Sequence, residues 1–328
     1  MNGIRIRHWL SPLVTGFVIS WTCVSANFTA RATASEFKLL SDLQYDQVGE
    51  EHQGHAGLLD VYLPQASTSA AIDSGSATDV SQPRRTGEPN TRRPVVLVVH
   101  GGGWMTGDKW TMYRHASELA KRGIAAVSIN YRLAPKSKFP DQVDDLRMAL
   151  VWIHEHAEEY HFDLDRVGLY GYSAGGHLVS LVATLADEPW ERVQDTTTWD
   201  QNDGRWKQIP SITAVCAGGP PTDFRNMPPE SLALSYFLGG TRKQMPSTYI
   251  AASPICFASA EDPVFKIIHG EEDVLVALSN ATDFHQALLD ANVDSMLQTL
   301  PNKGHLMAFF SGQLTDGVIG FFTERLKP

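Results

Sequence analysis

The chain has 328 residues, of which 43% are hydrophobic and 20% are charged, a composition typical of a soluble globular protein with a large core. Its formal net charge is −10 at pH 7. This acidic balance argues against a nucleic-acid partner, because proteins that bind nucleic acids usually present a basic surface.

The first 34 residues have the pattern of an export signal. Positive residues at 5–8 precede a mostly apolar stretch at 10–24, and small residues at 24–26 and 32–34 offer two candidate cleavage sites. A membrane anchor and a buried helix are the alternatives, but the apolar stretch is short for a span of roughly 20 residues. We therefore expect a signal peptide and a short mature extension within 1–34, a periplasmic or secreted location, and no stable membrane span.

Strands and helices alternate along most of the remaining chain. A first strand at 58–64, in a hairpin meander, precedes a stretch at 65–93 with almost no large apolar residues, which we interpret as a flexible surface insertion. Short apolar segments predict the other strands: 95–99, 124–129, 167–170, 212–216, 264–268 and 296–300. Helices are predicted at 113–122, at 141–160 and 174–185, where apolar residues recur at helical spacing, and near the end of the chain at 278–291 and 318–326. Such alternation predicts an α/β domain at 35–328 with a parallel sheet covered on both faces.

The strongest motif lies between the strand at 167–170 and the helix that follows it. Residues 171–175 read Gly-Tyr-Ser-Ala-Gly, a G-x-S-x-G sequence. A serine on a tight strand-to-helix turn holds its hydroxyl above the sheet, and glycines two residues away let the backbone turn that sharply. The motif alone is a weak signal, but this context predicts that Ser173 is a nucleophile.

A serine nucleophile needs a base that takes its proton. His305 follows the last predicted strand in a glycine-containing loop, from which it can reach Ser173. The other histidines that we considered lie on or after helices: His154, His156, His161, His177 and His285, of which His177 is expected to pack within its helix. We predict His305 as the base, since it also fits the chain order nucleophile, acid, base of such sites.

The histidine in turn needs a carboxylate that fixes its tautomer and stabilises its cation. Asp273 follows the strand at 264–268 and is the predicted acid, with Glu272 as its competitor. Asp223, which follows another strand, is a weaker rival that we expect to cap a turn.

Three consecutive glycines begin at Gly101, directly after the strand at 95–99. Attack on a carbonyl creates an oxyanion that needs preorganised N–H donors, usually from the residue after the nucleophile and from a glycine loop. We predict an oxyanion hole formed by Gly101, Gly102 and Ala174. Trp104 and Tyr172, which are close to these residues in the sequence, are the candidate substrate-binding side chains.

These motifs resemble those of the α/β-hydrolase superfamily, and within it those of the esterases and lipases with an HGGGW sequence, which include hormone-sensitive-lipase-like carboxylesterases and bifunctional feruloyl/acetylxylan esterases. The resemblance is carried by HGGGW (100–104), NYRLAPKSKFPDQVDD (130–145), GYSAGGHL (171–178), SPICFASAEDPVFKIIHGEEDVLV (253–276) and KGHLMAFF (303–310). It implies a mostly parallel central sheet with helices on both faces, a short lid at about 227–252 that contains LSYFLGG as a helix, and a structural pair formed by Arg132 and Asp145.

The resemblance also implies an activity. We expect a serine carboxylic-ester hydrolase that works through an acyl-enzyme and acts on a small-molecule or polysaccharide-linked ester, such as an acetyl or feruloyl ester of a plant polysaccharide. Two alternatives remain: an amide hydrolase similar to arylformamidases on the same site, and a catalytically silent hydrolase fold that binds a ligand.

No cofactor or metal is expected. His52 and His55 have H-x-x-H spacing, but no further ligands of the usual spacing accompany them. An oxidising compartment would permit a disulfide between Cys216 and Cys256, although two free thiols are the favoured interpretation. The sequence leaves the oligomeric state open.

Overall fold

The computed structural model describes residues 36–47, 56–65, 92–227 and 231–327. Within these residues, eight strands form one sheet in the order β1-β2-β4-β3-β5-β6-β7-β8. The strands are β1 Phe37–Gln44, β2 Leu58–Pro64, β3 Arg93–Val99, β4 Ala125–Ile129, β5 Phe162–Tyr172, β6 Ile212–Gly218, β7 Val264–Gly270 and β8 Ser295–Leu300. The predicted signal segment 1–34, most of the insertion 65–93 and the pair His52 and His55 lie outside the described residues.

Helices connect the strands and cover the sheet. The α-helices are α1 Tyr113–Lys121, α2 Asp141–Glu155, α3 Ala157–Tyr160, α4 Ala174–Thr184, α5 Trp190–Val193, α6 Leu232–Leu238, α7 Pro246–Ala251, α8 Ser279–Asp290, α9 His305–Phe309 and α10 Gly312–Arg325. Short 3₁₀ helices are η3 Lys109–Met112, η4 Gln194–Thr196, η5 Gly204–Gln208 and η6 Pro254–Phe257.

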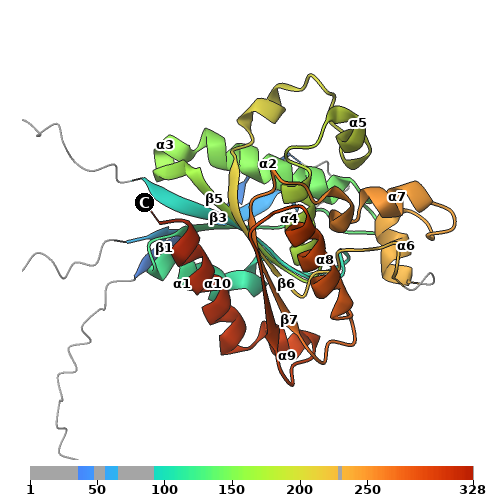
Figure 1. Ribbon diagram of the computed structural model, residues 1–328. Coiled ribbons are helices and arrows are strands. Elements are labelled where there is room, and N and C mark those ends of the chain that lie inside the picture. Colours follow the sequence, from blue (N-terminus) through green and yellow to red (C-terminus); the bar gives the residue numbers. More distant parts are fainter. Residues whose placement is uncertain (1–35, 48–55, 66–91, 228–230, 328) are drawn as a thin grey trace, which may run out of the picture. The chain divides into compact units, whose positions relative to one another are not determined.

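The central strands are buried on both faces, as their continuous apolar sequences predict. Along β3, Val95, Leu97 and Val99 pack into a core shared with α2, α4 and α8, whereas Val96 and Val98 pack into a core shared with α1 and α10. Figure 1 shows these two groups of helices on opposite sides of the sheet. This arrangement confirms the α/β class.

The sheet is mostly parallel, with an antiparallel edge. From β4 through β3 to β8, all neighbouring strands pair in parallel. The strand β2 pairs antiparallel with both β1 and β4. The sequence interpretation missed β1, because this edge strand is largely exposed and lacks a continuous apolar run.

Several predicted boundaries were wrong. The strand predicted at 167–170 is longer at both ends, since β5 spans Phe162–Tyr172. The helix predicted at 141–160 is divided into α2 and α3 at His156, whose Nδ1 and backbone N–H both bond to the carbonyl oxygen of Trp152, at 2.9 and 3.0 Å. The helix α10 begins at Gly312 and not at residue 318, because the Ser311 side chain caps it by accepting from the N–H of Leu314. Arg93, placed in the insertion, belongs to β3.

A buried carboxyl group near the start of β7 makes the stability of the fold depend on pH. Asp262 accepts the N–H of Ser259 through Oδ2 at 2.9 Å, while its buried Oδ1 has no hydrogen-bond partner among the described residues. Burial raises the pKa of Asp262 to about 7, and the negative charges of Asp187 and Glu188 act in the same direction. The folded chain therefore holds a proton here at pH values at which the unfolded chain has lost it.

Since this proton is bound only in the folded state between about pH 4 and 7, the contribution of Asp262 to stability falls as the pH rises through that window. Asp262→Asn keeps the acceptor for Ser259 and removes the charge. We expect the stability advantage of the variant to widen between pH 4 and pH 8 by about 1–3 kcal/mol, measured by urea denaturation. Glu261→Gln, an exposed neighbour, is the control that should leave the pH dependence unchanged. Parallel stability curves for Asp262→Asn and the parent would contradict the assignment.

Candidate active site

Ser173 lies on a sharp turn between β5 and α4. Its φ of 55° and ψ of −120° fall in a region that side-chain-bearing residues rarely adopt. The Ser173 N–H bonds to the carbonyl oxygen of Gly218 at 2.7 Å. A Cβ atom on Gly171 would lie 2.2 Å from the carbonyl oxygen of Gly175, and one on Gly175 would lie 2.2 Å from that of Val99. The turn thus requires glycine at both glycine positions of the G-x-S-x-G motif.

Gly171→Ala should destabilise the fold, because the clash with the Gly175 carbonyl can be relieved only by moving the backbone of the turn. We expect a loss of at least about 1–3 kcal/mol in the free energy of unfolding. Gly320→Ala in α10 is the control, since nothing lies within 4 Å of its added Cβ, and a helical Gly-to-Ala change is favourable by up to about 1 kcal/mol. Urea denaturation of both variants tests the expectation, which fails if Gly171→Ala is as stable as the parent.

His305 and Asp273 are joined by a short hydrogen bond. His305 is the first residue of α9, and not part of an open loop as the sequence suggested. Its Nδ1 donates to Oδ2 of Asp273 at 2.5 Å. Oδ1 of Asp273 accepts the N–H groups of Leu275 and Val276, both at 2.9 Å. Burial acts to raise the pKa of Asp273, but the hydrogen bonds from His305 and Val276 outweigh it and hold the pKa below its ordinary value. The carboxylate is therefore charged and orients the imidazole.

The two alternative acids, Glu272 and Asp223, do not bond to His305. Glu272 is exposed, and its backbone N–H bonds to the carbonyl oxygen of Lys303. Asp223 binds the guanidinium of Arg225 through both carboxylate oxygens, at 2.8 and 2.9 Å, and accepts the Arg225 N–H, as a turn-capping residue does. Only Asp273 among these carboxylates bonds to His305.

The glycine loop offers unpaired backbone donors beside Ser173. Among the described residues, the N–H groups of Gly101, Gly102 and Ala174 have no hydrogen-bond acceptor. Gly102 has a φ of +124°, and a Cβ atom on it would lie 1.9 Å from the carbonyl oxygen of Thr106. Glycine is therefore needed at this position for the loop conformation itself as well as for close approach of a ligand.

Trp104 connects the glycine loop to the predicted lid. Its indole N–H donates to Nδ1 of His177 at 3.1 Å, and its ring stacks on Phe237 of α6 with centroids 4.5 Å apart. Burial lowers the pKa of His177 to about 4, so the neutral ring accepts this bond while its Nε2 donates to the carbonyl oxygen of Ala252 at 2.8 Å. His177 is thus a packed histidine, as the sequence suggested, and its bond to Trp104 fixes the indole.

Tyr172 connects the elbow to His305. Its hydroxyl donates to the carbonyl oxygen of His305 at 2.5 Å, and the two rings lie 5.2 Å apart. Tyr172 and Trp104, the two predicted substrate-binding residues, both line the cleft described next, but the polar group of each is already bonded within the protein. What they offer a ligand is therefore the surface of their rings.

Ser173 and His305 share one cleft of about 560 Å³. Its walls come from the glycine loop, the elbow, the lid residues Met227 and Leu234, and Val276 and Phe309. None of the described residues that line it is an aspartate, glutamate, lysine or arginine. Among the described residues, the Ser173 hydroxyl has no hydrogen-bond partner, so the bond to His305 is not formed here; in ligand-free enzymes such bonds are often long or poorly aligned.

The sequence interpretation missed His269, at the end of β7. Its Nε2 donates to the carbonyl oxygen of Val276 at 2.9 Å and lies 3.4 Å from Oδ2 of Asp273. Burial lowers the pKa of His269, which therefore stays neutral next to the carboxylate. This bond braces the loop whose N–H groups hold Asp273. Its place four residues before the predicted acid is the signal that could have identified it.

The structure also shows the predicted Arg132–Asp145 pair and the state of the two cysteines. Arg132 pairs with Asp145 through Nε at 2.8 Å and Nη2 at 2.7 Å, as the resemblance implied. Cys216 is buried in β6 and Cys256 is half-buried, and both are free thiols. None of the helices in the described ranges is both long and apolar enough to cross a membrane.

A mostly parallel sheet that presents a serine elbow after its central strand β5 defines the α/β-hydrolase fold, and this chain has that fold. Within that fold, the chain belongs to the BD-FAE family, whose model matches residues 79–288.

Sequence relatives and solved structures agree with this assignment. The chain is 31% identical over 227 residues to Esterase LipQ of Mycobacterium tuberculosis, which covers 66% of this chain and 51% of that protein. It is 34% identical over 198 residues to the probable carboxylic ester hydrolase LipM of the same organism, covering 58% and 44%. The chain thus spans about half the length of these curated relatives. A solved structure described as a truncated form of carbohydrate esterase from gut microbiota has the same fold, with a TM-score of 0.71 and 21% identity over 89% of this chain and 98% of that one.

Proposed function

We propose that this protein is a serine hydrolase of carboxylic esters. The observation that carries the proposal is the 2.5 Å bond between His305 and Asp273 at the wall of the cleft that also holds Ser173. A carboxylate-bound histidine beside an elbow serine can activate the hydroxyl, because the carboxylate fixes the tautomer and stabilises the imidazolium that forms. The named relatives, an esterase and a probable carboxylic ester hydrolase, support the same reaction class.

The proposed reaction has two halves. Oγ of Ser173 attacks the ester carbonyl carbon as its proton moves to Nε2 of His305, and the oxyanion is stabilised by the N–H groups of Gly101, Gly102 and Ala174. Collapse of the tetrahedral intermediate breaks the bond to the alcohol oxygen, which takes the proton from His305. Water then attacks the acyl-enzyme with His305 again as the base, and the acid and free Ser173 are released.

The cleft suits an uncharged substrate. The described residues of its walls are largely apolar and include no charged side chain, so an ionic group would lose its hydration against them without gaining a partner. We propose an acetyl or feruloyl ester of a plant polysaccharide as the substrate class. The solved carbohydrate esterase of the same fold supports this choice, and the signal-like pattern at 1–34 supports an exported enzyme that meets such polymers outside the cell.

A substrate panel tests the proposal: p-nitrophenyl acetate, acetylated xylan, methyl ferulate and a formyl-arylamine, with Ser173→Ala as the blank. We expect turnover of the esters, with the formyl-arylamine at least about a hundredfold slower in kcat/KM, a difference of about 2.7 kcal/mol in transition-state stabilisation. Faster hydrolysis of the formyl-arylamine would establish the amide hydrolase instead. No turnover of any substrate above the blank would leave a silent hydrolase fold that binds a ligand.

A further inference from the structure

A second cleft, of about 510 Å³, lies at the opposite edge of the sheet from Ser173. Its lining includes Ser211 and Ile212, where β6 begins, and Glu261 and Pro263, just before β7. Asp273, by contrast, follows the carboxyl end of β7. Because β7 has seven residues and a strand rises about 3.3 Å per residue, the two sites are separated by roughly 20 Å along the strand direction. Nothing in the proposed reaction uses this cleft.

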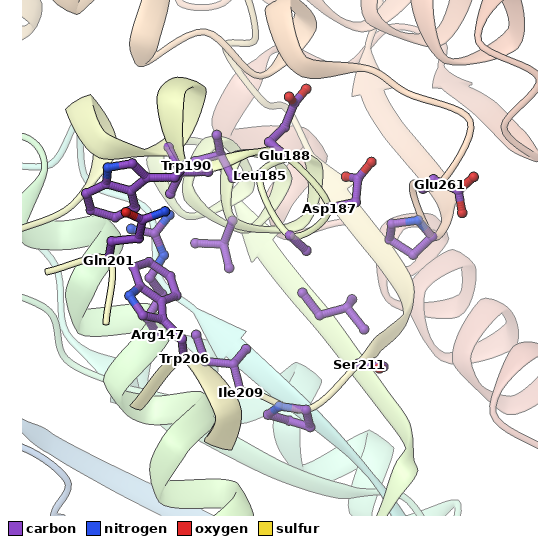
Figure 2. Close-up of a pocket in the computed structure, with 16 residues that line it drawn as sticks. Arg147, Leu185, Asp187, Glu188, Trp190, Gln201, Trp206, Ile209, Ser211 and Glu261 are labelled. Carbon is purple, nitrogen blue, oxygen red and sulfur yellow. The ribbon is translucent and has the colours of Figure 1, made fainter. Parts of the chain in front are cut away.

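One end of the second cleft carries two indole rings, those of Trp190 and Trp206 (Figure 2). The indole N–H of Trp206 donates to the carbonyl oxygen of Asp200 at 2.9 Å. The guanidinium of Arg147 lies 5.0 Å from the Trp206 ring centroid, and Trp199 packs edge-on against the same ring at 5.0 Å. These contacts fix the orientation of Trp206 before any ligand arrives.

The other polar groups of the cleft accept or donate hydrogen bonds but carry little positive charge. Gln201 lies beside the two indoles, and Asp187, Glu188 and Glu261 lie at the far end (Figure 2). Glu188 is paired with Arg192 at 2.5 Å, which leaves the exposed carboxylates of Asp187 and Glu261 as the accessible charges. Arg147, the one cation among the described residues that line the cleft, is buried and paired with Asp144 at 3.1 Å.

We propose that this second cleft binds a neutral sugar chain of the polysaccharide that carries the ester. A pyranose ring has an apolar C–H face that packs on an indole and a rim of hydroxyl groups that bond to amides and carboxylates. The cleft supplies both surfaces, in the mixture of apolar walls and a few polar groups that is typical of ligand sites. This inference rests on the proposed function only for the identity of the polymer.

The charges of the cleft exclude the competing ligand classes. An anionic ligand would face the carboxylates of Asp187 and Glu261, while the cation among the described lining residues, Arg147, is buried. A purely apolar ligand would strip water from the same carboxylates without replacing their hydrogen bonds. A cationic peptide is disfavoured at the indole end, because Arg147 already occupies one face of Trp206 and would repel a second cation there.

A sugar chain held in this cleft would keep the enzyme on the polymer while esters enter the cleft with Ser173. Such tethering raises the effective concentration of substrate without changing the chemical step. Its signature is a lower KM for the polymer, with no effect on a small ester that cannot reach the second cleft.

The test uses the full chain and ester-free xylohexaose, with binding measured by isothermal titration calorimetry. We expect Trp190→Ala to weaken binding at least about tenfold, the loss typical of an aromatic anchor. Trp190→Phe should retain part of the affinity, because it keeps a ring. Gln201→Ala, an exposed residue whose change does not threaten the fold, should weaken binding as well. Trp110→Ala is the matched control: it removes an indole that is 68% exposed and lies outside this cleft.

Activity assays on the same variants separate the two proposals. Trp190→Ala should keep the parent kcat/KM for p-nitrophenyl acetate and show a raised KM for acetylated xylan. Two outcomes would overturn the sugar site without contradicting the esterase activity. In the first, the parent is active but does not bind xylohexaose. In the second, Trp190→Ala and Gln201→Ala bind xylohexaose as tightly as the parent does. Binding of poly-L-lysine in place of xylohexaose would assign the cleft to a cationic partner and equally overturn it. An inactive parent that binds xylohexaose would contradict the proposed function alone.

Discussion

Ser173→Ala should reduce kcat for p-nitrophenyl acetate by about five to six orders of magnitude, the loss seen when the nucleophile of a serine hydrolase is removed. Without Oγ no acyl-enzyme can form, and water has to attack the ester directly. The oxyanion donors and the cleft remain, so a residual rate above the uncatalysed reaction should persist. Single-turnover and steady-state kinetics, with the variant purified under conditions that exclude carry-over of parent enzyme, measure the loss.

The fold should survive this change. Among the described residues, the Ser173 hydroxyl makes no hydrogen bond, so its removal leaves no buried partner unsatisfied. Serine and alanine also face the same backbone strain at the φ of 55°, since both carry a Cβ atom. The thermal unfolding midpoint of Ser173→Ala should therefore match that of the parent. A rate within about tenfold of the parent, or about 1.4 kcal/mol in the barrier, would show that Ser173 is not the nucleophile.

The elbow could be predicted from the sequence because its causes are local. The glycines at 171 and 175 are demanded by contacts within the turn itself and with β3, so a five-residue pattern is enough to reveal them. The buried strands were equally visible, since a strand covered on both faces needs an uninterrupted apolar run. The edge strand β1 has no such run, and its pairing with β2 depends on a partner outside its own sequence.

The features of the site that the sequence did not predict depend on contacts between segments that are distant in the chain. Asp273 and Glu272 are adjacent carboxylates after the same strand, β7. Which of them bonds to His305 depends on which side chain points towards α9, and the sequence does not show that direction. The contacts from Trp104 through His177 to Ala252 likewise join residues whose pairing no spacing rule reveals. The second cleft combines residues from 147 to 263, which no local pattern connects.

Asp273→Asn is expected to lower kcat by about 10⁴, whereas Glu272→Gln should stay within about threefold of the parent. The loop that holds residue 273 supplies the reason. The N–H groups of Leu275 and Val276 bond to Oδ1 and require an acceptor there, so the amide oxygen of the asparagine takes that place. The amide NH₂ group then faces Nδ1 of His305 in the place of Oδ2.

An NH₂ group can only donate, so it selects the tautomer of His305 in which Nδ1 accepts and Nε2 carries the proton. In that tautomer Nε2 cannot take the proton of Ser173, although every side chain of the site keeps its position. The loss should therefore fall on kcat, with little change in KM or in the free energy of unfolding. Glu272→Gln controls for a change of charge one residue away, because its exposed side chain does not touch the imidazole. If Glu272→Gln lost the larger share of kcat, Glu272 and not Asp273 would be the carboxylate that orients the base.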